Sequence, residues 1–395
     1  MSLLSVPEAQ ARILALGTPL SIETVPLVDA AGRWLAEAIT ARRSQPAADL
    51  SAMDGYAIRH AELPGPWAVV GESAAGGGLD RALAPGEAAR IFTGAPVPDG
   101  ADTILVQEEA ARDGDRVRLD GKGPEERGRS VRRQGSDFAE GDALLAVGDL
   151  LNPARIALAA IGGHGVLPVR SRPRVAILST GDELVRPGEP TPGVLLPASN
   201  GPMLAALLAG RPTTVIDGGI VRDDLDALAA AFADAASRTD VIVTTGGVSV
   251  GDRDLVRPAL ERAGAHLDFW KVAMRPGKPL MAGRLGEAVV IGLPGNPVSA
   301  FVTAHLFLLP LLAHLAGAAD PLPPSGQARL TAALPGVGAR ADYLRGRLRD
   351  GGIEPFASRD SAILSELARA DVLIVRGPSA EPAEAGDLAT YLRIA

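Results

Sequence analysis

The stretch from Thr239 to Asp254 limits the possible folds of this chain more than any other stretch. Its first part, residues 240–245, is a run of β-branched and apolar residues too short for a helix, so it predicts a buried strand. The glycine pair Gly246–Gly247 then ends that strand abruptly. Ligands of open parallel sheets bind beyond the carboxyl ends of the strands, so we expect the chemistry of this chain in the loop that follows.

The loop after this strand offers several groups to one ligand. The two glycines let the backbone approach an anion without a Cβ atom in the way, and Ser249 adds a hydroxyl. Asp252 and Asp254 cannot hold a phosphate themselves because like charges repel, so a metal ion or an attacking water is their more sensible partner. The alternative is that the glycines form an ordinary turn and that both aspartates are solvated.

The size and composition of the chain indicate a globular protein of several domains. A length of 395 residues predicts two to four domains. Aromatic residues make up only 3%, so Ala, Val and Leu must fill the interior. The net charge of −8 argues against nucleic acid as the main partner, although a local basic pocket for a small anion remains possible.

Missing residue types and segments exclude further classes. The chain has no cysteine, which excludes disulfides, thiolate metal sites and cysteine nucleophiles, and its five histidines show no zinc-ligand spacing. The amino-terminal end lacks a basic region followed by an apolar core. No apolar run reaches membrane-spanning length. We therefore expect a cytoplasmic protein with no membrane partner.

Helical signals lie near the amino terminus and again after residue 149. Residues 5–8 have the form of a capping box and predict a helix that stops near Gly17. A second helix is predicted around residues 28–41, and a third from Pro153 to Ile161, ended by two glycines. We expect residues 1–44 and 149–172 to form a helical arm or dimerisation segment.

Residues 45–148 change to short β-like runs broken by Gly and Pro, which predicts a small β domain. Asp54, next to a glycine, could act as a base or a metal ligand, but an Asp-Gly pair is more often a turn. Arg132 and Arg133 stand a few residues before Asp137. Paired arginines suit phosphate binding, yet a basic pair on the surface is usually only solvated.

Residues 173–318 alternate between strand-like and helix-like runs, which predicts a parallel sheet covered on both faces. Each predicted strand ends in a loop with polar groups. The four loops contain Thr180 to Glu183, Gly246 to Asp254, Arg275 to Pro279 and Pro294 to Ser299. In a parallel sheet all four lie at one edge, where Lys278, Ser299 and the start of the helix after Pro297 could meet one phosphate.

Residues 319–395 return to short strands and predict a second β domain. The segment from Arg340 to Arg347, which includes Arg345, could offer a cation to an anionic ligand, and Ser361 could donate a hydroxyl. For Arg340 and Arg347, a solvated surface position is the alternative.

Six motifs together resemble one family, the MoeA-type molybdopterin molybdenumtransferases, which include the E domain of gephyrin. They occur in the family's order over nearly the whole chain. The motifs are SAMDGYA (51–57), TGAPVP (93–98), STGDEL (179–184), TGGVSVGDRD (245–254), PGKP (276–279) and GLPGNPVSA (292–300). The resemblance implies an α/β multidomain fold, with a central parallel α/β sandwich of the molybdopterin-binding type, small flanking β domains and a helical arm.

The resemblance also implies a reaction and its participants. Adenylylated molybdopterin is hydrolysed and molybdate is inserted into its dithiolene, which gives molybdenum cofactor and AMP with the help of a divalent cation such as Mg²⁺. A homodimer is implied, and a molybdopterin adenylyltransferase and molybdoenzymes are possible partners.

Individual roles are implied by the same resemblance. Asp254 matches the catalytic and metal-linked carboxylate, with Ser249 and Asp252 beside it, and Glu183 matches a functional acid of the central domain. Asp54 and Asp137 match aspartates that reach the active site of the other subunit. The binding residues expected at the edge of the sheet and in the molybdate site are Thr180, Gly246, Gly247, Arg275, Lys278, Asn296, Ser299, Arg345 and Ser361.

The sequence departs from the family pattern in three places. Arg275 stands where Lys is usual, which keeps the charge but replaces a compact ammonium by a planar fork. Residues 134–136 differ from the usual Arg-Gly-Glu before Asp137, and Leu50 replaces Asn. Two other function classes compete with the enzyme: a non-catalytic scaffold of the same fold, and a nucleotide hydrolase or adenylyltransferase that shares only the central domain.

Overall fold

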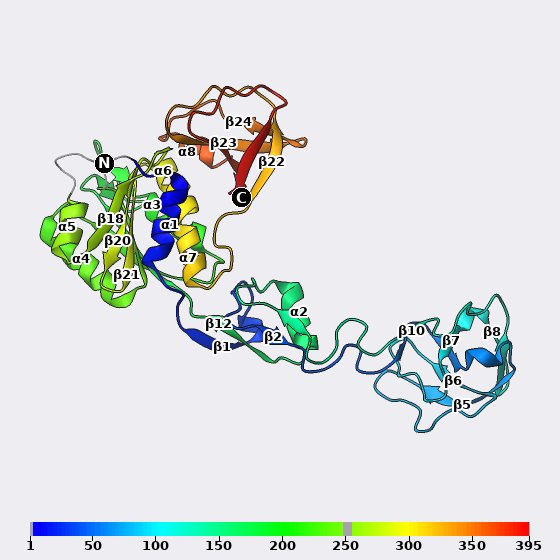
Figure 1. The fold of residues 1–395 in the computed structure, drawn as a ribbon. Helices are drawn as coiled ribbons and strands as arrows, with labels where there is room; N and C mark the ends of the chain where they lie inside the picture. Colours follow the sequence, from blue (N-terminus) through cyan, green and yellow to red (C-terminus); the bar gives the residue numbers. More distant parts are fainter. Residues whose placement is uncertain (1–2, 248–254, 395) are drawn as a thin grey trace.

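The structure is a computed structural model that describes residues 3–247 and 255–394. Figure 1 shows an elongated molecule in which the central α/β module and the carboxyl-terminal β module lie at one end. A thin arm connects them to a small β domain at the other end. The functional groups of the small β domain are therefore far from the central module of the same chain.

The central module is built on a six-stranded sheet of order β16-β13-β17-β21-β20-β18. The strands are β13 (Arg174–Thr180), β16 (Thr214–Val221), β17 (Val241–Thr245), β18 (His266–Lys271), β20 (Pro279–Leu285) and β21 (Ala288–Leu293). The first four in the order run parallel, but β20 is antiparallel to both of its neighbours. The prediction of a parallel sheet was therefore wrong for β20, because the loop of residues 272–278 before it and the tight turn at residues 286–287 after it each reverse the chain.

Alternate residues along these strands pack against helices on opposite faces of the sheet. One face is covered by α1 (Val6–Leu16), α3 (Asn200–Leu208) and the continuous helix made of α6 (Pro297–Thr303), the π-helical segment η4 (Ala304–Leu308) and α7 (Leu309–Leu315). The other is covered by α4 (Leu225–Arg238) and α5 (Val256–Arg262). Ser5 caps α1 through its side chain, as the capping box predicts.

Helix α1 packs into the central core, whereas the sequence led us to place residues 1–44 together in the arm. Its buried residues Val6, Ala9 and Ile13 belong to the same cluster as the sheet and α7. The backbone N–H of Ala273 also donates to the carbonyl of Leu4. The apolar stripe of α1 does not reveal which neighbour it will cover, and here the neighbour is distant in sequence.

The helix from Pro297 to Leu315 has 19 residues and is apolar enough to cross a membrane by length and composition alone. This corrects the prediction that no apolar run reaches that length. Within the structure, however, 78% of its apolar window is buried against the sheet and its neighbours. Its composition is explained by its position in the core.

The arm is mostly β-structure. Strand β1 (Ile22–Pro26) pairs with β12 (Val166–Arg170), β2 (Ile39–Thr40) pairs with β11 (Ala143–Leu145), and α2 (Pro153–Ile161) packs beside them. The predicted helix at residues 28–41 was wrong: a short turn, η1 (Leu27–Asp29), and strand β2 form there instead. Gly32 has φ +74°, and Leu35 forms a bridge to Val169, so tertiary pairing overrides the helical pattern.

The small β domain contains a six-stranded sheet of order β7-β4-β6-β5-β9-β8. Its strands are β4 (Gly55–Ile58), β5 (Trp67–Ser73), β6 (Glu87–Ile91), β7 (Thr103–Val106), β8 (Ala110–Asp113) and β9 (Arg116–Leu119). A short ladder of β3 (Leu50–Ser51) with β10 (Val131–Arg132) lies next to Asp54, and the turns η2 (His60–Glu62) and η3 (Gln107–Glu109) connect strands. This confirms the predicted β character.

The carboxyl-terminal module is a second β structure with its own core. Its sheet consists of β22 (Ser325–Leu330), β23 (Ala341–Arg349), β24 (Gly352–Pro355), β25 (Val372–Arg376) and β26 (Leu388–Arg393). Pairing of β23 with β25 closes it into a barrel. A short strand from the central module, β19 (Met274–Arg275), pairs with β23 and places Arg275 opposite Asp342. The loop that carries Lys278 is thereby attached to both modules.

Candidate active site at the carboxyl edge of the central sheet

Three of the four predicted loops meet at the carboxyl ends of β13, β17 and β21. The hydroxyl of Thr180 donates to the carbonyl of Thr245 (3.3 Å), and the N–H of Gly246 donates to the carbonyl of Leu293 (3.3 Å). A Cβ atom on Gly295 would lie 3.4 Å from the Cα of Gly246. The strands therefore bring these loops together as the sequence predicts.

The glycine pair at this edge is required by both conformation and space. Gly246 has φ +94° and Gly247 has φ +59°. A Cβ atom on Gly246 would collide with the carbonyl oxygen of Thr180, and one on Gly247 would lie 2.5 Å from a methyl group of Val256. Any side chain here would push the loops apart, so the glycines keep backbone groups available at the edge.

The fourth loop, residues 272–278, packs on the same edge through Gly277. This residue has φ +98°, and a Cβ atom on it would collide with the methyl group of Thr303 in α6. The N–H of Val272 donates to the carbonyl of Lys278 (3.0 Å) and closes the loop. Arg275 and Lys278 are both exposed, so their charges are available to a ligand.

The start of α6 adds polar groups to this edge. Asn296 occupies the N-cap position, and its buried Oδ1 has no hydrogen-bond partner among the described residues. Asn200, at the start of α3, donates from Nδ2 to the carbonyl of Gly295 (2.8 Å) and holds this loop in place. Ser299 lies in the first turn of α6 and is only 5% exposed. The free amide groups of this turn favour a negatively charged ligand.

The predicted residues Ser249, Asp252 and Asp254 lie outside the described residues. On either side of them, Gly247 and the start of α5 at Val256 are in contact, as the glycine geometry shows. The described residues on both sides of them, Gly247 and Val256, therefore lie at the edge formed by Thr180, Gly246 and Gly295.

Carboxylates gather on the rim next to Thr180. Asp182 accepts a hydrogen bond from the N–H of Asp223 (3.2 Å), and Glu183 lies beside them on the surface. Partial burial and the negative charges of Asp182 and Glu183 raise the pKa of the Asp223 carboxyl above its usual value. Of these three carboxylates, the sequence analysis assigned a role only to Glu183. The position of Asp223 just after β16 could have identified it, because that strand ends at the same edge.

Cations prefer such a rim, but the described residues do not form a complete metal site. Among residues 3–247 and 255–394, no group of three acidic or imidazole side chains is close enough to hold an ion. Carboxylate oxygens are nevertheless the ligand type that Mg²⁺ prefers, so Asp182 and Glu183 fit it chemically.

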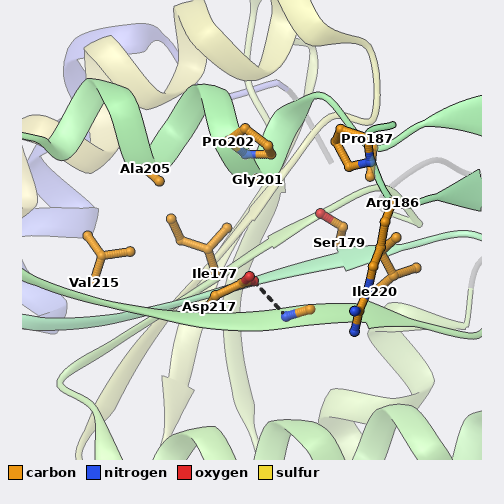
Figure 2. A pocket seen from close by; sticks show the side chains of 12 residues that line it. Ile177, Ser179, Arg186, Pro187, Gly201, Pro202, Ala205, Val215, Asp217 and Ile220 are labelled. Atoms are coloured by element: carbon orange, nitrogen blue, oxygen red, sulfur yellow. Dashed lines mark hydrogen bonds between the residues drawn. The ribbon is translucent and has the colours of Figure 1, made fainter. Parts of the chain in front are cut away.

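A cavity of about 400 Å³ opens beside these loops, between α3 and strands β13 and β16. Figure 2 shows apolar side chains on its walls, among them Ile177 and Val215, with Asp217 near Ile177 in the middle and Arg186 at one end. Asp217 accepts a hydrogen bond from the N–H of Gly219 (2.8 Å). A second hollow of about 540 Å³ shares Arg186 and Ile220 with this cavity and is also lined by Asp182. The two form one groove that leads to the carboxylate rim.

The carboxyl-terminal module contributes Arg345 and Ser361 near α6, because its short helix α8 (Leu364–Leu367) contacts α6. Arg345 is only 3% exposed and forms an ion pair with Glu366 (2.8 Å). It also donates to the carbonyls of Ser358 (2.7 Å) and Asp360 (3.2 Å). The charge of Arg345 is thus already paired, and the residue holds the turn that carries Ser361.

The small β domain holds the other predicted carboxylates. Oδ1 of Asp54 accepts two hydrogen bonds from Thr93, from its N–H (2.7 Å) and its hydroxyl (2.9 Å). These bonds, with the charge of Arg90, lower the pKa of Asp54. We assigned no chemistry to the 93–98 loop from the sequence, and its contact with Asp54 was missed. Asp137 is exposed on the loop after β10. In Figure 1 the small β domain, with β4 following Asp54 and β10 preceding Asp137, lies apart from the central module of the same chain.

Comparison with known families assigns every module. The family model for the MoeA N-terminal region (domains I and II) matches residues 4–163. The model described as a probable molybdopterin binding domain matches residues 176–314. The model for the MoeA C-terminal region (domain IV) matches residues 327–394. The fold, with its site at the carboxyl edge of the central sheet, therefore defines a molybdopterin-binding protein of several domains.

Individual relatives extend over most of the chain. Molybdopterin molybdenumtransferase from Haemophilus influenzae is 36% identical over 87% of this chain and 86% of its own length. The protein of the same name from Nostoc is 37% identical over 89% of this chain and 84% of its own length. A crystal structure of the molybdopterin biosynthesis MoeA protein from Pyrococcus horikoshii is 26% identical, with a TM-score of 0.86 over the full length of both chains. This chain belongs to the MoeA family of molybdopterin molybdenumtransferases.

Proposed function

We propose that this protein inserts molybdenum from molybdate into adenylylated molybdopterin and hydrolyses the adenylate to give molybdenum cofactor and AMP. The observation that carries the proposal is the convergence of the glycine pair, the Lys278 loop and the start of α6 at one edge. The names of the relatives supply the chemistry.

We infer that the oxyanions bind where backbone amides and cations meet. Lys278 and Arg275 are exposed beside the first turn of α6, which contains Ser299 and begins at Asn296. Molybdate and the pterin phosphate are both negatively charged, so they gain from ammonium, guanidinium and helix-terminal amide groups. Thr180, Gly246 and Gly247 form the adjacent wall, where the small glycines admit a phosphate next to the backbone.

The groove between α3 and β16 is our candidate site for the flat ring of the substrate. Its apolar walls suit a heteroaromatic ring, and Asp217 and Arg186 could hydrogen-bond its polar edge. The groove leads to the carboxylate rim, so a substrate bound in it would have its phosphoanhydride near the loop of Asp254.

Hydrolysis of the adenylate needs an oriented water. We propose that Asp254 orients this water, with Asp252, Ser249 and Glu183 beside it, because carboxylates accept the protons of an attacking water. Asp252, Asp254 and the rim carboxylates would hold Mg²⁺. A bound Mg²⁺ would neutralise charge at the phosphoanhydride. Arg345 would act by holding the turn that presents Ser361 to the molybdate site.

We further propose a homodimer, because the small β domain lies at the other end of the elongated chain from the central module. In such a dimer, the small β domain of one subunit would complete the site of the other. The proposed division is an arm, a small β domain at about 45–148, a central module at 173–318 and a β module from 319, with α1 packed on the central module. A cytoplasmic location with a molybdopterin adenylyltransferase and molybdoenzymes as partners would fit this function.

Two variants test the proposed roles. Asp254→Ala should abolish cofactor synthesis without changing the melting curve, since a loop carboxylate contributes little to stability. Lys278→Ala should weaken binding of molybdate more than binding of adenylylated molybdopterin. Synthesis that persists in the first variant would overturn the role of Asp254, and equal weakening in the second would assign Lys278 to the nucleotide.

A further inference from the structure

Another cavity, separate from the groove described above, lies at the opposite end of the central sheet. Its volume is about 530 Å³. Four parts of the chain line it: the arm at Trp34, 148–150 and Arg155, the central module at 211–213 and between His305 and Ala313, the connecting segment at 319–324, and the carboxyl-terminal module at Arg393. Residues 211–213 directly precede β16, so this cavity lies at the amino-terminal edge of the parallel strands.

The floor of this cavity contains polar groups that have no hydrogen-bond partner among residues 3–247 and 255–394. His305 is 6% exposed, and neither of its ring nitrogens has a hydrogen-bond partner among the described residues. The hydroxyl of Thr213, on the same lining, is also buried without a partner there. Unsatisfied buried polar groups cost free energy, so several in one cavity indicate a polar occupant.

The backbone of His305 is unusual as well. It lies in the π-helical segment η4, between α6 and α7, and its ring stacks on Phe301 at a centroid distance of 6.3 Å. Such interruptions of a helix are frequent at functional sites. No residue placed at the carboxyl edge of the sheet lines this cavity.

The rim of the cavity is cationic. Arg211 and Arg393 line it, are exposed, and form no ion pair with any described carboxylate. Arg155 is paired with Asp149 (3.0 Å), and the remaining acid in the lining, Asp320, is exposed. Two guanidinium groups are therefore available above a floor on which the imidazole of His305 and the hydroxyl of Thr213 can each donate one hydrogen bond, which is a combination suited to phosphate oxygens.

We propose that this cavity binds a phosphate monoester, with the phosphate held by Arg211, Arg393 and His305. The volume exceeds that of a phosphate alone, and Trp34, Leu309 and Leu312 provide apolar surface for the organic part of such a ligand. Because the arm, the central module, the connecting segment and, through Arg393, the carboxyl-terminal module all contribute, a bound ligand would hold these four parts together.

The experiment measures binding of inorganic phosphate and of phenyl phosphate to the protein. Calorimetry gives the affinity, and the NMR signals of the five histidines show which histidine responds. The signal of His305 is assigned from its loss in His305→Gln. Each ligand should bind and shift this signal, and phenyl phosphate should bind more tightly. Arg211→Ala should weaken binding at this site roughly tenfold, the effect expected when a charged hydrogen bond is lost.

Two controls separate this cavity from the carboxyl edge and from general charge effects. Lys278→Ala should leave the response of His305 unchanged, and Arg118→Ala, an exposed arginine of the small β domain, should do the same. The proposal is overturned if the His305 signal does not respond, which would leave ordered water as the occupant. It is also overturned if Lys278→Ala removes the response and Arg211→Ala does not.

Discussion

At the scale of single residues, Asp54 shows how the small β domain prepares a carboxylate. Its Oδ1 accepts both the N–H and the hydroxyl of Thr93, which favours the ionised form. The SAMDGYA motif suggests an aspartate with a role, but it does not show that the separate 93–98 loop holds it. That contact depends on the pairing of distant strands, which local patterns do not specify.

Thr93→Val should raise the pKa of Asp54 while leaving it below 3.8, because the backbone hydrogen bond remains. A carboxyl whose pKa is lowered in the folded state contributes stability above pH 3.8, and this is lost as the pH falls through the folded value. The stability difference between variant and wild type should therefore shrink in acid. Carboxyl NMR and urea unfolding measure both quantities, with the exposed Thr191→Val as control. An unchanged Asp54 pKa would contradict the assignment.

His305 makes a pH prediction in the same direction as Asp54 but at higher pH, because its pKa is also lowered in the folded state. Burial, with the nearby charge of Arg211, lowers the pKa of His305 from 6.5 to about 4. The unfolded chain therefore takes up the proton first, so stability should fall as the pH drops from 6.5 towards 4. The cost is roughly 2–3 kcal/mol. In His305→Phe this part of the loss should vanish. Equal losses in both proteins, measured without phosphate in the buffer, would show that His305 does not titrate as described.

At the scale of elements, short-range patterns predicted the strands and their loops but not how every strand runs. The β-branched run before Gly246 and the proline-glycine loops identified the edge, because those signals are local. Strand β20 was missed and the helix at residues 28–41 was wrong, since both depend on partners far along the chain. The packing of α1 against α7 escaped prediction for the same reason.

Gly277 is the glycine on which the position of the Lys278 loop depends most. Gly277→Ala should cost about 1–3 kcal/mol more than Gly286→Ala, because overpacking adds to the strain of a positive φ. Gly286 is a matched control, with φ +60° and nothing near its missing Cβ. Thr303→Ser removes the obstructing methyl group and keeps the hydroxyl bonded to Ser299. Adding it to Gly277→Ala should restore most of the stability lost beyond that of Gly286→Ala. Unfolding curves measure each variant, and equal costs at the two glycines would contradict the close packing.

At the scale of the whole molecule, the elongated shape separates groups that the sequence assigned to one site. The loops of Thr180, Gly246, Lys278 and Ser299 come together within the central module, whereas the small β domain that contains Asp54 lies at the other end of the molecule. Motif order along the chain predicts a shared function but contains no information about this separation. Likewise, the ion pair of Arg345 with Glu366 could not be read from either segment alone.

Mixing two inactive variants tests whether the site is shared between subunits. If Asp54 of one subunit serves Asp254 of the other, a mixed dimer of Asp54→Ala and Asp254→Ala contains one intact site of two. Random assembly makes half of the dimers mixed, so about a quarter of wild-type activity should return. Sites built within single chains would leave every site damaged, and no activity would return.

The most direct test of the proposed function is AMP release from adenylylated molybdopterin by the purified protein. The release should require both molybdate and Mg²⁺, and it should be accompanied by formation of active molybdenum cofactor. Release that proceeds equally well without molybdate would contradict molybdenum insertion and indicate a nucleotide hydrolase. No release, despite tight binding of the pterin, would contradict it as well and indicate a scaffold of the same fold.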